Sequence, residues 1–96
     1  MSPKNKKNLK ILRKRLDTID SKMLNIIKKR SIIVKKVLTL KKYKNQIVDK
    51  KRILVILKKI RKESLKKNID PKITKRIWMN MIWSFIDYER RNFKKK

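Results

Sequence analysis

The sequence predicts an all-α fold with three helices in each chain, one long and two shorter. Apolar residues in the first 40 positions recur at alternating spacings of four and three, which is typical of a long helix that packs against other helices. Two later segments repeat apolar residues at helical spacing, and each follows an aspartate suited to capping a helix. No segment shows the alternation of polar and apolar residues that favours a strand.

The first helix is expected from about Leu9 to about Lys42, because no proline or glycine interrupts this stretch. One position of its apolar seam, between Ile26 and Ile33, is occupied by Arg30. A permanent cation at a heptad core position either extends its head group to solvent or serves a bound anion. The rest of the seam consists of Leu12, Leu16, Ile19, Met23, Ile26, Ile33, Val37 and Leu40.

A polar stretch, 42–48, predicts a loop, and Asp49 is a plausible N-cap for a second helix from Lys50 to about Lys67. After a second connection at 66–70, Asp70 and Pro71 predict another helix start, because a capping carboxylate precedes proline in the first helical position. The apolar face of the second helix consists of Ile53, Ile56, Leu57 and Ile60.

The third helix is expected to end at about Phe93. Residues 1–96 are expected to form a single helical domain, with flexible ends at 1–8 and 94–96. The residues of the third helix expected to face inward are Ile77, Trp78, Met81, Ile82 and Phe85.

The length of the first helix predicts an intertwined homodimer. A helix of about 32 residues is about 48 Å long, whereas a compact globule of this size has a radius of gyration near 13 Å. The helix is therefore expected to extend beyond its two shorter partners with its apolar seam uncovered. The simplest way to bury that seam is contact with a second copy of the chain.

Composition excludes several kinds of chemistry. The chain has no Cys and no His, so disulfides, thiolate chemistry and the usual zinc ligands are absent, and we expect neither a metal nor a cofactor. Lys and Arg number 33 against 7 acids, giving a net charge of +26, part of which we attribute to a genome rich in AT codons. Without a signal peptide or an apolar run of membrane length, a cytoplasmic protein with no membrane association is expected.

Three charged residues are expected near the inner faces of the helices. Arg30 lies within the first seam, and Arg52 directly precedes the apolar stripe of the second helix. Glu89 follows Phe85 by four positions, so it continues the inner face of the third helix. Because an unpaired buried charge is costly, this arrangement favours a cavity for a small anion, whose carboxylates arginine binds in bidentate fashion.

The distribution of these residues resembles that of the all-helical chorismate mutases, small intertwined dimers that convert chorismate to prephenate without a cofactor in aromatic amino acid biosynthesis. The resemblance covers about Leu9 to Arg91. It rests on LRKRLDTIDSKMLNIIKKR in the first helix, a lysine at the end of that helix, DKKR, IDPKITKRIW and the final glutamate of FIDYE.

The resemblance implies a role for each matched residue. Arg13 is expected to reach from one subunit into the site of the other, Arg30 to hold a carboxylate, and Arg52 to bind the anionic groups of the substrate. Asp49 is expected near the ring hydroxyl, although its position as a helix N-cap explains it equally well.

The two catalytic residues that the resemblance implies are Lys41 and Glu89. Both are expected to donate hydrogen bonds to the ether oxygen of the C–O bond that breaks, where negative charge develops. Glu89 donates only when protonated, and the sequence leaves its protonation state open.

Two positions depart from the mutase pattern. Ile53 stands where mutases usually carry a glutamate that binds the C4 hydroxyl, and Phe85 stands where they tend to have Ser or Thr. These departures resemble the isochorismate pyruvate-lyases, which share the fold and the Arg and Lys set and release pyruvate to leave salicylate. Chorismate and isochorismate therefore both remain candidate substrates.

A nucleic-acid-binding protein is the alternative from another class, because a charge of +26 attracts phosphate backbones. The basic residues are spread over all segments rather than gathered in one stripe, and no recognition motif is present. We therefore expect only non-specific binding to nucleic acids, through net charge.

Overall fold

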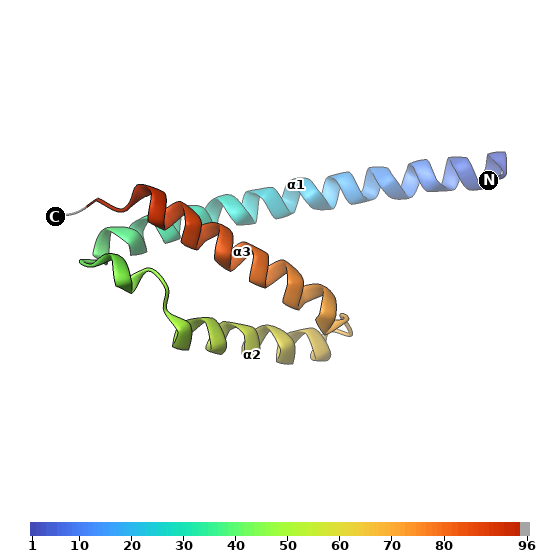
Figure 1. The fold of residues 1–96 in the computed structure, drawn as a ribbon. Coiled ribbons are helices and arrows are strands. Elements are labelled where there is room, and N and C mark those ends of the chain that lie inside the picture. The colour runs from blue at the N-terminus through green and yellow to red at the C-terminus, as the bar shows by residue number, and fades with distance from the viewer. Residues whose placement is uncertain (95–96) are drawn as a thin grey trace. The chain divides into compact units, whose positions relative to one another are not determined.

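In the computed structural model, which describes residues 1–94, the chain forms three α-helices and one short 3₁₀-helix and no strand (Figure 1). This confirms the predicted all-α fold with one long and two shorter helices. The chain divides within its first helix into two compact units, Met1–Ile33 and the part from Val34 onward. The elements are α1 (Pro3–Leu40), η1 (Lys44–Gln46), α2 (Lys50–Lys66) and α3 (Pro71–Asn92).

Helix α1 begins at Pro3, about two turns before the predicted start at Leu9. The hydroxyl of Ser2 accepts a hydrogen bond from the Asn5 backbone N–H (3.2 Å), and proline in the first position lacks only an N–H that would have no helical partner. The flexibility expected of residues 1–8 stays a prediction. Of the flexible end expected at 94–96, residues 95 and 96 lie outside the described part.

Within the first unit, the seam of α1 lies open to solvent in the single chain. Its side chains from Leu12 to Ile33 are between 47% and 66% exposed. Arg30, in the same seam, is half-buried. An apolar stripe of this length, left uncovered, marks a surface suited to association.

Helices α2 and α3 begin at the aspartates that were predicted to cap them. The Asp49 side chain accepts a hydrogen bond from the Arg52 backbone N–H at 3.0 Å. The Asp70 side chain accepts one from the Lys72 backbone N–H at 2.9 Å, with Pro71 opening the helix. Each cap satisfies an N–H group that the helix itself leaves without a partner, so local chemistry fixes both starts.

The connection between α2 and α3 is a tight C-terminal cap that places the two helices side by side (Figure 1). Asn68 adopts a left-handed backbone conformation with φ of 56°. The Ile69 N–H bonds to the Ser64 carbonyl (2.9 Å) and the Asn68 N–H to the Leu65 carbonyl (3.3 Å), which is the Schellman pattern. Asn68 occupies this position because Asn tolerates the left-handed region and the chain contains no Gly.

The core of the second unit is small and apolar. Ile82 and Ile86 of α3 are buried together with Ile47, which lies just after η1. The α2 face predicted from the sequence is half-buried, as expected. Ile77 was wrongly predicted to face inward: it is 45% exposed, because it lies five residues before Ile82 and thus about 140° around the helix. The half-buried residues packed against this core are Val48, Ile53, Ile56, Leu57 and Phe93.

At the end of α1 the packed face also differs from the prediction. Val34 and Leu38 are half-buried, whereas the predicted seam residues Val37 and Leu40 are 42% and 83% exposed. Val34 and Leu38 are four residues apart and so share one face of the helix. In the second unit the helix therefore packs with a face next to the heptad seam.

A buried pair of hydroxyl groups joins α2 to α3. Ser64 Oγ lies 2.8 Å from Thr74 Oγ1 and 2.6 Å from the Ile60 carbonyl oxygen. The Thr74 hydroxyl also lies 3.4 Å from the Pro71 carbonyl oxygen, and either hydroxyl can donate to the other. Both polar groups are thereby satisfied inside the helix pair.

Candidate functional site

The second unit contains a charged pair that joins α3 to the end of α1. Lys41 directly follows the last residue of α1, and Glu89 lies near the end of α3. Lys41 Nζ donates to Glu89 Oε2 at 2.9 Å, and the two side chains are 19% and 7% exposed. The burial of Glu89, predicted from its position in the helix, is therefore confirmed.

The loop that follows α1 is held by a single side chain. Gln46 Oε1 accepts hydrogen bonds from the backbone N–H groups of Lys42 (2.7 Å) and Tyr43 (2.8 Å). The Lys41 N–H bonds to the Leu38 carbonyl at 3.1 Å, which closes the last turn of α1. These bonds fix the backbone on either side of Lys41. Sequence reasoning missed the role of Gln46, since a glutamine in a polar loop carries no distinguishing pattern.

The Lys41–Glu89 pair determines what this region can do chemically. An ammonium has three N–H donors, so the bond to Glu89 leaves two that can serve a ligand. As a carboxylate, Glu89 only accepts hydrogen bonds, and it becomes a donor on protonation. The pair can thus present one donor, or two after Glu89 takes up a proton, to the same ligand atom.

The predicted site residues at the start of α2 differ in environment. Asp49 is exposed and acts as the N-cap, which supports the structural explanation of this residue. Arg52 is exposed in the single chain, because the buried face of α2 begins one residue later. Its expected place in the site of a dimer stays a prediction. Ile53 is half-buried and packs against the apolar core.

The remaining predicted residues lie on α1 and α3. Phe85 is half-buried one turn before Glu89. In the first unit, Arg13 is exposed and Arg30 is half-buried. Among the predicted site residues, Lys41 and Glu89 are in direct side-chain contact.

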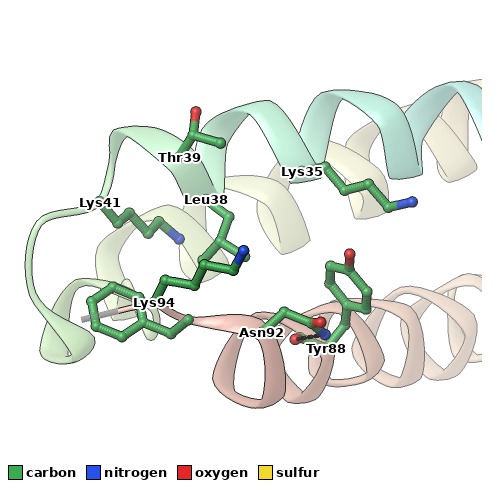
Figure 2. Close-up of a pocket in the computed structure, with 8 residues that line it drawn as sticks. Lys35, Leu38, Thr39, Lys41, Tyr88, Asn92 and Lys94 are labelled. Carbon is green, nitrogen blue, oxygen red and sulfur yellow. Dashed lines mark hydrogen bonds between the residues drawn. The ribbon is translucent and has the colours of Figure 1, made fainter. Parts of the chain in front are cut away.

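Beside Lys41 lies an open pocket of about 450 Å³, shown in Figure 2. Three of its lining residues are lysines, and Lys35 and Tyr88 face each other across it (Figure 2). Its lining was not found from the sequence, because single lysines carry little information in a chain with 33 basic residues. The pocket is lined by Lys35, Leu38, Thr39, Lys41, Tyr88, Asn92, Phe93 and Lys94.

Residues 1–94 contain no cluster of His, Cys, Asp and Glu side chains that could hold a metal ion. In the same range, none of the helices combines the length and hydropathy required to cross a membrane.

Three helices and a partly buried ammonium–carboxylate pair make the chain a small all-helical protein with a charged site. The sequence profile of the chorismate mutase type II family matches residues 12–90, a range that includes every predicted site residue from Arg13 to Glu89. The chain therefore belongs to the chorismate mutase type II family. No curated protein and no solved structure matches it.

Proposed function

We propose that the protein is a chorismate mutase that rearranges chorismate to prephenate. The observation that carries this proposal is the 2.9 Å contact between Lys41 and Glu89 in a chain whose residues 12–90 match the family. These two side chains are the ones that the sequence resemblance assigns to the ether oxygen of the substrate. They are 48 residues apart in the sequence, and their side chains are in contact in the second unit.

The reaction requires no nucleophile, because it is pericyclic. The C–O bond of the enolpyruvyl ether breaks while a C–C bond forms to the ring, and no proton is gained or lost overall. Negative charge grows on the ether oxygen as the bond lengthens, and the Lys41 ammonium donates to that oxygen. Protonated Glu89 is the second donor, so its ion pair with Lys41 opens when substrate binds.

The substrate must also be held in the conformer that reacts. We assign its carboxylates to Arg30 and Arg52, with Arg13 contributed by a second copy of the chain. A guanidinium pairs with a carboxylate through two parallel hydrogen bonds, which fixes orientation as well as position. Holding the flexible dianion in its reactive geometry accounts for part of the rate enhancement.

The contribution of Arg13 requires a homodimer. The exposed seam of α1 supports this assembly, because its side chains from Leu12 to Ile33 are about half exposed or more in the single chain. Sedimentation or light scattering at micromolar concentration is expected to give about twice the chain mass of 11.8 kDa. A stable folded monomer contradicts the shared site.

Substitutions at Arg30 distinguish binding of the substrate carboxylate from packing of the side chain in the helix seam. Arg30→Ala is expected to lower kcat/KM by a factor on the order of 10²–10³, the loss typical of truncating one partner of a buried charge pair. Arg30→Lys is expected to be nearly as poor, because an ammonium cannot form the bidentate contact. A fully active Arg30→Leu variant shows instead that Arg30 is only a core arginine with a solvated head group.

The direct test is turnover of two substrates. Incubation with chorismate, followed by ultraviolet absorbance and identification of the product, is expected to yield prephenate. Isochorismate is tested in parallel. Formation of pyruvate and salicylate from isochorismate, without prephenate from chorismate, assigns the protein as an isochorismate pyruvate-lyase.

The lyase is retained as an alternative because two positions that are polar in mutases are apolar here. Ile53 packs against the core formed by Ile47, Ile82 and Ile86, and Phe85 is half-buried. Ile53→Glu is expected to raise mutase turnover by about tenfold, the value of one hydrogen bond to the substrate hydroxyl. Ile53→Gln is the matched control, which adds a polar side chain of similar size without the charge. Unchanged or lower turnover in a folded Ile53→Glu variant contradicts the predicted contact.

A further inference from the structure

The lysine-lined pocket of Figure 2 is a second candidate site, next to the proposed catalytic pair but largely separate from it. The site residues predicted at the start of α2, which are Asp49, Arg52 and Ile53, do not line this pocket, and neither do Phe85 and Glu89 of α3. Lys41 alone belongs to both. The pocket therefore presents a set of side chains that the proposed function does not use.

The charge of the pocket favours an anion. Its lining contains three lysines and no carboxylate. Lys41 is paired with Glu89, whereas Lys35 and Lys94 have no carboxylate within ion-pairing distance among residues 1–94. The Lys35 ammonium lies 5.9 Å from the centre of the Tyr88 ring, close enough for a cation–π contact that keeps it at the edge of the pocket. The three lysines give the pocket a positive potential that attracts an anion.

The remainder of the lining favours a ligand with an apolar body. Leu38, Phe93 and the Tyr88 ring contribute carbon surface, and the Asn92 side chain is fixed by its bond to the Tyr88 carbonyl (2.9 Å). A volume of about 450 Å³ lies within the range of pockets that hold small molecules. A bare inorganic ion uses the lysines but leaves this apolar surface in contact with water.

We propose that this pocket binds a small arylcarboxylate, with the carboxylate between Lys35, Lys41 and Lys94 and the ring against the apolar side chains. Because Lys41 lines the pocket, the bound carboxylate competes with Glu89 for its ammonium. If Lys41 also has the catalytic role given above, the ligand lowers turnover, and this consequence rests on the proposed function. Binding of the ligand to the pocket does not depend on the proposed function.

Isothermal titration with benzoate tests the site on the full chain, with neutral benzamide and inorganic phosphate as matched probes. Benzoate is expected to bind to the wild type at least about tenfold more tightly than either probe, since only benzoate combines the charge with the ring. Equal binding of benzamide shows that the lysines are not used. Equal binding of phosphate shows that the apolar surface is not used. Either result overturns the assignment.

Two single-residue variants test whether benzoate binds in this pocket. Lys35→Ala is expected to weaken benzoate binding by about tenfold, the loss typical of one charged hydrogen bond. The neighbouring Lys36→Ala removes the same charge from an exposed residue that does not line the pocket, and it is expected to bind as the wild type does. Equal losses in the two variants mean that only net charge matters, which overturns the site.

A variant of the proposed substrate site tests whether benzoate binds there instead of in the pocket. Arg30→Ala is expected to retain benzoate binding while it loses turnover. Binding that disappears in Arg30→Ala but persists in Lys35→Ala places benzoate in the substrate site and overturns the separate pocket. Benzoate binding in a protein that shows no turnover leaves this inference standing and refutes only the proposed function.

Discussion

Two polar side-chain pairs, one buried and one partly buried, join helices of the second unit. They differ in charge and in the sequence separation of their residues. The Ser64–Thr74 pair is neutral, joins residues 10 apart, and lies beside the connection between α2 and α3. The Lys41–Glu89 pair is charged, joins residues 48 apart, and links the end of α1 to α3. Both replace water around buried groups with a partner from the protein.

The two pairs differ in how many hydrogen-bond donors remain available to a ligand. The two hydroxyl groups bond to each other and to the carbonyl oxygens of Ile60 and Pro71, so this pair is satisfied within the helices. Lys41 keeps two N–H donors beyond its bond to Glu89 and adjoins a pocket. A fully satisfied neutral pair serves stability, whereas a charged pair with spare donors has the capacity to act on a ligand.

The largest effect is expected from Lys41→Met. Loss of a donor aimed at developing charge lowers kcat by a factor on the order of 10²–10³. Lys42→Met, which removes the same charge from an exposed neighbour, is the control and is expected to retain turnover. Circular dichroism at the assay temperature checks that both variants are folded. Full activity in Lys41→Met refutes the catalytic assignment.

Glu89→Gln is expected to make turnover less dependent on pH. Turnover is measured at about pH 5 and at about pH 8. If Glu89 must be protonated to donate, the wild type is less active at the higher pH, whereas an amide donates at both. At about pH 8 the variant is expected to exceed the wild type by a factor on the order of ten, the value of one hydrogen bond to developing charge. A wild type that is equally active at both pH values, with an inactive Glu89→Gln, rules out the neutral donor.

Ser64→Ala is expected to affect stability rather than turnover. The substitution removes the buried hydrogen bond to Thr74 and leaves that hydroxyl only its long contact with the Pro71 carbonyl oxygen, so the free energy of unfolding in urea decreases by about 1 kcal/mol. Thr74→Val is expected to have a similar effect, and the double variant to lose less than the sum because the two residues share one interaction. A large loss of kcat in folded Ser64→Ala removes the distinction between the two pairs.

The smallest effect concerns the cap of α2. Asp49→Ala is expected to destabilise the protein by about 1 kcal/mol, whereas Asp49→Asn keeps an oxygen that accepts from the Arg52 N–H and so retains stability. Turnover of Asp49→Asn then isolates the charge. A raised KM in Asp49→Asn with unchanged stability identifies a substrate contact in addition to the cap.

The helices could be predicted where local chemistry fixes them. Asp49 and Asp70 cap α2 and α3 as expected, since a carboxylate beside free N–H groups needs no knowledge of the rest of the fold. The missed start of α1 has the same origin, because Ser2 followed by Pro3 is the same capping pattern as Asp70 followed by Pro71. The burial of Glu89 followed from helical periodicity alone.

The candidate site was predictable only in part. The resemblance indicated Lys41 and Glu89, but the contact between them depends on how the loop, α2 and the second connection bring the end of α3 back to Lys41. The exposure of Arg52 and the packing of Val34 and Leu38 depend on helix orientation, which a heptad pattern does not specify. The pocket beside Lys41 combines residues from both ends of the second unit, and no local pattern marks them.

The Schellman connection at Asn68 also has a consequence for the order of folding. It lets α2 meet α3 through contacts that are close in sequence, such as the Ser64–Thr74 bond between residues 10 apart. Closing the 48-residue separation between Lys41 and Glu89 costs roughly 1.4 kcal/mol more in chain entropy, at about 0.6 kcal/mol for each doubling of loop length. The α2–α3 hairpin is therefore expected to form in the folding transition state, with the Lys41–Glu89 contact forming after it. Substitutions at Ser64 then slow folding, whereas those at Lys41 chiefly speed unfolding.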